Sequence, residues 1–165
     1  MKYLILLCAL IFGSCQNTTK IYIVRHAEKN ITPANDPQLS QAGLRRAEEL
    51  KEVLKGKNIG NIFSTNTYRT RETAMPLSMQ INVPMQLYVM DTVKRFLAHV
   101  SNMRTNVLVI GHSNTLLPML DYLGVQHTVT AIGDYTYNNL FIVTVKKGKA
   151  VKVEETTYGA ENPAK

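Results

Sequence analysis

Two histidines directly follow apolar segments, where an imidazole can serve as a nucleophile or as an anion ligand. His26 follows the run 20–24 (KIYIV) and one arginine, Arg25, while His112 follows the run 106–111 (NVLVIG). Continuous apolar runs of this kind are typical of strands that are covered on both faces. Ligands of such sheets bind at the carboxyl ends of the strands, so we expect both histidines to line one site. A neutral imidazole can attack an electrophile, and an imidazolium can hold an anion.

A third segment, 64–74 (STNTYRTRETA), adds a cation to this expected site. Ser64 ends a predicted strand, and Arg69 falls in the first turn of the helix that follows. A helix N-terminus favours an anion through its free N–H groups and its dipole, and an arginine there adds a planar donor for phosphate oxygens. Arg71 lies roughly 200° further around the helix, so we expect Arg71 to be solvated.

Strand and helix signals alternate along the chain, and this order determines the expected fold. The predicted strands are 20–24, 58–65, 82–90, 106–111 and two strands within 138–158, and the predicted helices are 39–56, 66–81, 91–103 and 114–124. Such alternation predicts an α/β fold, a three-layer α/β/α sandwich with a mostly parallel sheet. The turn at Lys147-Gly148 predicts a C-terminal antiparallel hairpin at the edge of the sheet.

The first residues differ from the rest of the chain. Residues 1–15 (MKYLILLCALIFGSC) hold a lysine, an apolar run too short to span a bilayer, and small residues before a cysteine. This pattern resembles a bacterial lipoprotein signal, which would leave Cys15 as a lipidated N-terminus; the alternative is an ordinary signal peptide with a coincidental cysteine. The remaining chain is predicted to comprise a polar tether (16–19), one folded domain (20–158) and a tail (159–165). We therefore expect an exported protein, anchored by lipid in a bacterial cell envelope, either facing the periplasm or in the outer membrane.

Composition limits the classes of protein that this chain can belong to. Its 165 residues are 45% hydrophobic, which suits one domain with a real core. Without residues 1–14 the chain keeps a single cysteine, so an internal disulfide is impossible. Removal of residues 1–14 also removes one lysine, so the formal net charge falls from +7 to +6. A basic surface concentrates phosphate esters and equally suits anionic lipid headgroups, so the charge alone does not choose between them.

Four stretches together resemble the histidine phosphatase superfamily, the phosphoglycerate-mutase-like group. They are RHAE (25–28), LSQAGLRRAEEL (39–50), STNTYRTRETA (64–74) and GHSN (111–114), and they occur in the family's order. The resemblance extends from about residue 20 to residue 145 and covers most of the expected domain. The chain has no room for the large insertions of longer members, so it resembles a small, insertion-free member with a lipoprotein-like signal.

The resemblance implies a role for each residue of the expected site. His26 maps onto the nucleophile that forms a phosphohistidine. Arg25, Arg69 and His112 map onto the phosphate pocket, and a protonated His112 would bind the phosphate oxygens best. Two arginines and one imidazolium supply the positive charge, so no metal and no cofactor are expected. The implied partners are a phosphorylated small molecule or a phosphoprotein, and a membrane through Cys15, with no nucleic acid.

The group that protonates the leaving oxygen is less clear from the sequence. By chain order Asp91 is the best candidate for this acid, and Asp91 is also where an N-cap of the helix 91–103 is expected. Glu28 and Glu72 are further candidates, although Glu28 can instead pair with Arg25 at the surface. His99 and His127 lie outside the motifs, and we expect no catalytic role for either.

These inferences predict a metal-independent phosphatase that hydrolyses phosphomonoesters or phosphoamidates through His26. Only the segments 30–38 and 124–137 can cover the pocket, the second with Tyr135 and Tyr137. An open pocket suits varied or protein-borne substrates, as in the bacterial phosphohistidine phosphatases, and disfavours mutase chemistry, which needs a closed site. The alternative is a non-catalytic, phosphate-binding or anion-binding envelope lipoprotein. A purely structural envelope protein would explain none of the four stretches.

Overall fold

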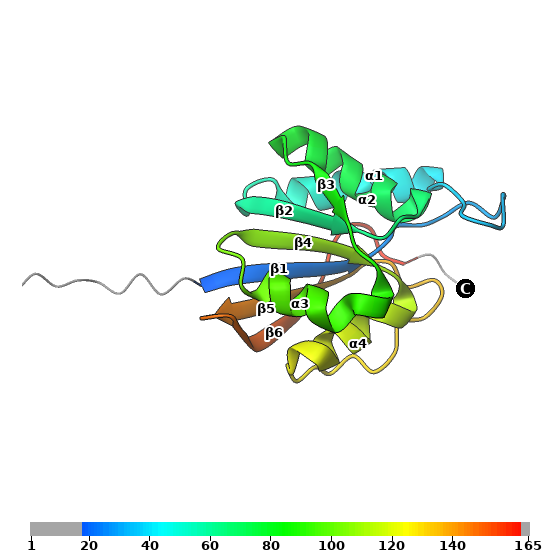
Figure 1. The fold of residues 1–165 in the computed structure, drawn as a ribbon. Coiled ribbons are helices and arrows are strands. Elements are labelled where there is room, and N and C mark those ends of the chain that lie inside the picture. The colour runs from blue at the N-terminus through cyan, green and yellow to red at the C-terminus, as the bar shows by residue number, and fades with distance from the viewer. Residues whose placement is uncertain (1–17, 163–165) are drawn as a thin grey trace, which may run out of the picture.

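A six-stranded sheet forms the centre of the molecule, and the computed structural model describes it within residues 18–162 (Figure 1). The elements in chain order are β1 (Thr18–Arg25), α1 (Gln41–Leu54), β2 (Ile59–Ser64), α2 (Tyr68–Ile81), β3 (Met85–Leu87), the short 3-10 helix η1 (Met90–Thr92), α3 (Val93–Ser101), β4 (Asn106–Gly111), α4 (Ser113–Leu123), β5 (Asn139–Lys146) and β6 (Lys149–Thr157). The expected signal segment with Cys15 lies outside the described residues.

The strand order is β3-β2-β4-β1-β5-β6. The pairs β3–β2, β2–β4 and β4–β1 are parallel, whereas β1–β5 and β5–β6 are antiparallel. The predicted α/β sandwich, with a mostly parallel sheet and a C-terminal antiparallel hairpin at its edge, is therefore confirmed. Because β1 and β4 are neighbours, with Arg25 opposite Gly111 in register, the segments that follow these two strands start side by side.

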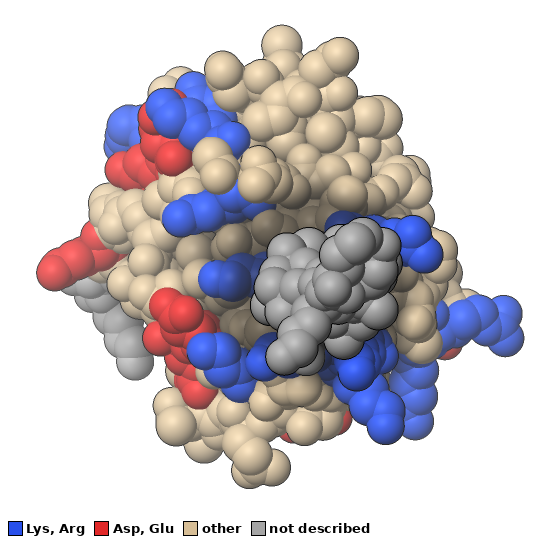
Figure 2. All heavy atoms as spheres, turned by 90° about the vertical axis from the view of Figure 1, so that its left-hand side faces the viewer, with Lys and Arg blue, Asp and Glu red and all other residues tan. Residues whose placement is uncertain are grey.

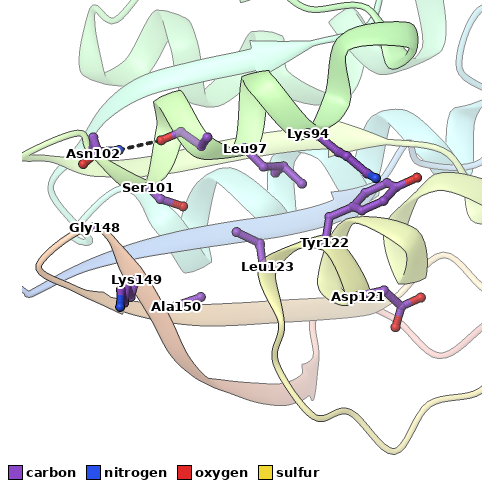
Figure 3. Close-up of a pocket in the computed structure, with 11 residues that line it drawn as sticks. Lys94, Leu97, Ser101, Asn102, Asp121, Tyr122, Leu123, Gly148, Lys149 and Ala150 are labelled. Carbon is purple, nitrogen blue, oxygen red and sulfur yellow. Dashed lines mark hydrogen bonds between the residues drawn. The ribbon is translucent and has the colours of Figure 1, made fainter.

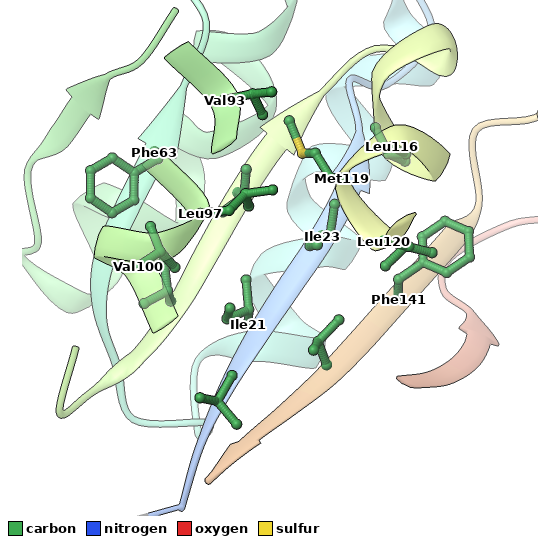
Figure 4. Close-up of a cluster of buried hydrophobic side chains, with 14 of the residues drawn as sticks. Ile21, Ile23, Phe63, Val93, Leu97, Val100, Leu116, Met119, Leu120 and Phe141 are labelled. Atoms are coloured by element: carbon green, nitrogen blue, oxygen red, sulfur yellow. The ribbon is translucent and has the colours of Figure 1, made fainter. Parts of the chain in front are cut away.

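Helices cover both faces of the sheet, with α1 and α2 on one face and α3 and α4 on the other (Figure 1). Alternate residues of β1 supply both layers of the core. Ile21 and Ile23 pack with side chains of α3 and α4 (Figure 4), whereas Tyr22 and Val24 pack with side chains of α1 and α2. Burial on both faces explains why residues 21–24 of β1 are all apolar, and it makes the strand a rigid support for the residues at its end.

Both ends of the domain extend beyond the predicted limits. Thr18 and Thr19, expected in the tether, belong to β1 and pair with Lys146 and Val145. In the predicted tail, the amide oxygen of Asn162 accepts a hydrogen bond from the backbone N–H of Tyr137 at 2.7 Å. The fold therefore includes residues that were predicted to belong to the tether and the tail.

The segment before α3 also differs from the prediction. The strand expected over 82–90 shortens to β3, and the helix expected from Asp91 begins at Val93 after the turn of η1. Between residues 18 and 162, none of the helices has the length and apolar character needed to cross a membrane.

A buried ion pair joins α1 to the loop after β1. Arg46 is 2% exposed and donates hydrogen bonds to both carboxylate oxygens of Glu28, the shortest at 2.8 Å. The same guanidinium donates to the backbone oxygens of Tyr158 and Ala160. Arg46 therefore ties α1 to both the start of the 26–40 loop and the end of β6, and Glu28 is not free to pair with Arg25.

Replacing Arg46 with alanine should lower the free energy of unfolding by about 3–5 kcal/mol, because the Glu28 carboxylate would be left buried without a partner. Urea denaturation measures the change. Arg45→Ala, on the exposed neighbouring residue, is the matched control and should shift stability by no more than about 0.5 kcal/mol. Equal losses in the two variants would show that the ion pair has no such role.

Candidate active site

The ends of β1 and β4 bring the two predicted histidines together. His26 follows Arg25, the last residue of β1, and its backbone N–H donates to the carbonyl of Gly111 at 3.0 Å. His112 follows Gly111, the last residue of β4. The two imidazole centroids are 5.4 Å apart, with the rings inclined at 65°. The expected meeting of the segments 25–28 and 111–114 is thus present in the fold.

His26 is held in one tautomer by its own backbone. The Nδ1 atom lies 2.8 Å from the carbonyl oxygen of Ala27, and a carbonyl can only accept, so Nδ1 carries the proton and Nε2 keeps its lone pair. The side chain is buried, and burial is the main cause that lowers the pKa of His26 to about 3, with Arg25, His112 and Arg69 lowering it further. At neutral pH His26 is therefore uncharged, and its Nε2 lone pair is free to attack an electrophile.

His112 is also neutral at pH 7 in this environment, whereas the protonated form was expected to bind phosphate best. Burial, then the charges of Arg69 and Arg25, lower the pKa of His112 to about 4. Its Nε2 lies 2.9 Å from the hydroxyl oxygen of Thr65, the residue that follows β2. A bound phosphate dianion would act against the two arginines and raise the pKa of His112 again.

Arg25 is fixed by the segment 124–137. Its Nη1 donates to the carbonyl oxygens of Gly133 at 2.8 Å and Thr136 at 3.0 Å, and the guanidinium carbon lies 4.3 Å from the ring centroid of Tyr137. One of the two expected lid segments therefore positions the guanidinium that was predicted to bind phosphate. The guanidinium Nε has no hydrogen-bond partner within residues 18–162.

Arg69 lies in the first turn of α2 and is held by the other expected lid segment, 30–38. Its Nη1 is 3.3 Å from a carboxylate oxygen of Asp36, which also accepts a hydrogen bond from the backbone N–H of Tyr68 at 2.9 Å. Asp36 thus links the loop to the start of α2. As for Arg25, the Nε of Arg69 lacks a partner in the described part of the chain.

These four side chains line one open pocket of about 450 Å³. The lining residues are Arg25, His26, Lys29, Arg69, Met90, His112, Ser113, Asn114 and Thr115. The first turn of α4 forms part of the wall, and a helix N-terminus favours an anion there. Within the described chain, this lining contains three cations and not a single carboxylate, so the pocket suits a tetrahedral dianion.

None of the three acid candidates lines this pocket. Asp91 is exposed in η1 beside Tyr122, and the N-cap of α3 is Thr92 without a capping side-chain bond, so the structure places Asp91 in neither predicted role. Glu72 accepts a hydrogen bond from the backbone N–H of Leu39 at 2.6 Å. Glu28 is paired with Arg46, as described above. This corrects the prediction that Asp91 reaches the site.

A larger hollow of about 630 Å³ lies between α3, α4 and the β5–β6 hairpin, and it lacks the chemistry of the first (Figure 3). Its polar lining includes Lys94, Asp121, Tyr122 and Lys149, with neither a histidine nor an arginine. His127 lies outside both linings, and its Nε2 is 3.1 Å from a carboxylate oxygen of Asp121. Size alone would therefore have selected the wrong pocket.

Several supporting residues were not predicted from the sequence. Thr73 accepts a hydrogen bond from the backbone N–H of Ala27 at 2.9 Å and donates to the carbonyl of Arg69 at 2.7 Å. Thr65 contacts His112, and Lys29 lines the pocket. Both threonines lie within the motif 64–74, so their position in that motif was the available signal.

The depressed pKa values predict how stability depends on pH. Histidines of the unfolded chain take up protons below about pH 6.5. In the folded protein His26 and His112 stay neutral until about pH 4 or below. The free energy of unfolding should therefore fall by about 2–4 kcal/mol as the pH is lowered from about 6.5 to about 4. Urea denaturation at a series of pH values measures the fall, and His26→Asn/His112→Asn should reduce it. The exposed control His99→Asn should leave the slope unchanged, and an unchanged slope in the double variant would contradict the prediction.

Comparison with known proteins agrees with this geometry. The model of the histidine phosphatase superfamily (branch 1) matches residues 21–90, the segment that carries Arg25, His26 and Arg69. No protein of curated function matches the chain in sequence.

Solved structures resemble the fold over nearly its whole length. A mycobacterial glucosyl-3-phosphoglycerate phosphatase superposes with a TM-score of 0.67 at 12% identity, covering 87% of this chain and 100% of its own. The protein histidine phosphatase SixA, complexed with tungstate, superposes with a TM-score of 0.63 at 20% identity, covering 84% of this chain and 97% of its own. A putative alpha-ribazole-5'-P phosphatase from Escherichia coli superposes with a TM-score of 0.63 at 14% identity, covering 86% of this chain and 96% of its own. The segment 21–90 is therefore similar to the histidine phosphatase superfamily, and the fold of the described residues is shared with these solved phosphatases.

Proposed function

We propose that the protein hydrolyses phosphomonoesters or phosphoamidates through a phosphohistidine intermediate on His26. The observation that carries the proposal is the state of this imidazole. Its Nδ1–H is fixed on the Ala27 carbonyl and its pKa is about 3, so the Nε2 lone pair is available at neutral pH. The imidazole shares an open pocket with Arg25, Arg69 and His112.

The proposed reaction has two steps. In the first, the Nε2 lone pair of His26 forms a bond to phosphorus, and the bond from phosphorus to the leaving group breaks with its electron pair on the leaving group. In the second, a water oxygen attacks phosphorus and one of its protons passes to solvent. The P–N bond breaks with its electron pair on Nε2, so the neutral imidazole is regenerated as inorganic phosphate leaves. Arg25, Arg69 and His112 bind the non-bridging oxygens while charge shifts between them.

The pocket favours substrates whose leaving group departs readily. An alkoxide needs a proton from a nearby acid, and the described lining holds no carboxyl group. A phosphoamidate or an aryl phosphate places less demand on such an acid. Among the structural neighbours, SixA is named as a protein histidine phosphatase and the mycobacterial enzyme as a glucosyl-3-phosphoglycerate phosphatase, so both classes of substrate are represented within this fold.

The second candidate is an anion-binding envelope lipoprotein without turnover, and the lack of a carboxyl group in the described lining favours it. In either case we propose that the chain is exported and anchored to a membrane by lipid at Cys15. The sequence pattern of residues 1–15 supports that anchor.

Removing the nucleophile distinguishes the two candidates. A chromogenic aryl phosphate, whose leaving group needs no acid, should be hydrolysed by the protein lacking residues 1–15, and His26→Ala should lower kcat/KM by at least about a thousandfold. His99→Ala is the control and should keep full activity. Phosphate binding without turnover in both the parent and His26→Ala would instead support the anion-binding protein.

The position of Asp91 makes a second, narrower prediction. Because Asp91 is exposed and lies outside the pocket, Asp91→Asn should change kcat/KM for alkyl and aryl phosphates equally and by less than about twofold. Parallel assays on one alkyl and one aryl substrate measure the ratio. A loss of about tenfold or more, confined to the alkyl substrate, would mean that Asp91 is the acid after all.

A further inference from the structure

Cationic side chains gather at the end of the sheet opposite the pocket. Figure 2 looks at this end of the molecule and shows lysines and arginines spread across it, with acidic side chains toward its margins. We call this surface the amino-terminal face and define it by six residues: Lys20, Lys57, Arg104, Lys146, Lys147 and Lys149.

The strand order brings these six residues together. Lys57 and Arg104 lie in the loops that lead into β2 and β4, and Lys20 lies near the start of β1. Because β5 is antiparallel to β1, its last residue, Lys146, pairs with Thr18 at the same end. The tight turn to β6 then adds Lys147. Residues far apart in sequence therefore present one cationic surface.

The charges of the amino-terminal face are not paired with carboxylates in the described part of the chain. All six side chains except that of Lys20 are exposed, and none forms an ion pair with a carboxylate of residues 18–162. The neighbouring acid Glu52, near the end of α1, already pairs with Lys51 and Lys55. The face is thus a net cationic surface that can attract an anionic partner.

A small hollow lies within this face, with a volume of about 190 Å³. Its lining residues are Thr19, Ser101, Asn102, Met103, Arg104, Val145, Lys147 and Gly148. Arg104 offers a planar donor that matches phosphate oxygens, and Lys147 offers a point charge. Two hydroxyls, an amide and two cations around a hollow of this size suit a phosphate-containing headgroup.

We propose that the amino-terminal face docks on an anionic phospholipid surface. The arrangement of the chain favours lipid over other polyanions. The apolar segment of residues 1–15 is followed after only two residues by Thr18, the first residue of β1 on this face. Three residues of extended chain span at most about 11 Å, so insertion or lipidation at Cys15 would hold the face within a short distance of the headgroups, where basic residues bind anionic lipid.

This docking fixes the direction of the active site. The pocket lies at the far end of β1, and eight residues of strand span about 25 Å. With the amino-terminal face on the membrane, the pocket opens into the aqueous phase. The substrate would then be a soluble or protein-borne phosphate, and a lipid phosphate within the same bilayer could not reach His26.

Vesicle binding by the protein lacking residues 1–15 tests the surface by itself. The form is suitable because every helix and strand of the described structure lies within residues 18–162. Co-sedimentation would compare vesicles of phosphatidylcholine alone with vesicles that also contain phosphatidylglycerol. We expect binding only to the anionic vesicles, and loss of binding as salt is added because the charges are exposed.

Charge reversal then locates the surface. Arg104→Glu/Lys147→Glu should weaken binding to the anionic vesicles at least about tenfold. Arg45→Glu/Arg95→Glu has the same net charge but changes exposed residues at the pocket end, and it should retain most of the binding. Equal loss in the two double variants would overturn the proposal, because net charge alone would then explain binding. Tighter binding to a single-stranded oligonucleotide than to anionic vesicles would also overturn it.

A second measurement uses the full chain held in vesicles, in case the shortened form binds too weakly to sediment. Hydrogen–deuterium exchange should show protection of 102–105 and 146–149 in anionic vesicles compared with neutral ones, with no change at 112–115. Lack of such protection, together with lack of sedimentation, would refute the docking surface. Activity on a soluble aryl phosphate should be unaffected by Arg104→Glu/Lys147→Glu, which separates this outcome from a failure of the proposed function.

Discussion

The parallel pairing of β1 with β4 is the constraint on which the rest of this structure depends. Residues of both strands are buried between two helical layers, so the register that sets Arg25 opposite Gly111 cannot slip without turning apolar side chains to the wrong face. The segments that follow the strands must therefore start side by side. This is why His26 and His112 lie 5.4 Å apart between ring centroids, and why a pocket forms at this end of the sheet.

The pocket concentrates positive charge that the carboxylates of residues 18–162 offset only in part. Two guanidinium groups and two imidazoles lie close together, and burial with mutual repulsion lowers the pKa values of both histidines far below their ordinary range. Asp36 is the carboxylate that contacts one of these arginines, through Nη1 of Arg69. A phosphate dianion would relieve this repulsion, so the same electrostatics that keep His26 nucleophilic also favour the binding of its proposed substrate.

Charge is divided between the two ends of the sheet in different forms. At the carboxyl ends the cations are partly buried and held by backbone carbonyls, as Arg25 is by Gly133 and Thr136, which suits one small anion. At the amino ends most of the lysines and Arg104 are exposed and unpaired within the described residues, which suits an extended anionic surface. The basic residues therefore form two separate groups, one in the pocket and one on the amino-terminal face, and each group suits a different kind of anion.

The sequence by itself determined the order of strands and helices, the strand-end positions of His26 and His112, and the place of Arg69 at a helix start, because periodicity and motifs are local properties of the chain. It did not determine the position of Asp91, which depends on a short 3-10 turn that moves the start of α3 by two residues. The tertiary structure alone decided that Asp36 and Gly133 hold the two arginines, that Glu28 is buried against Arg46, and that the amino-terminal face forms. These contacts join segments far apart in sequence, and only the packing of the whole sheet sets such distances.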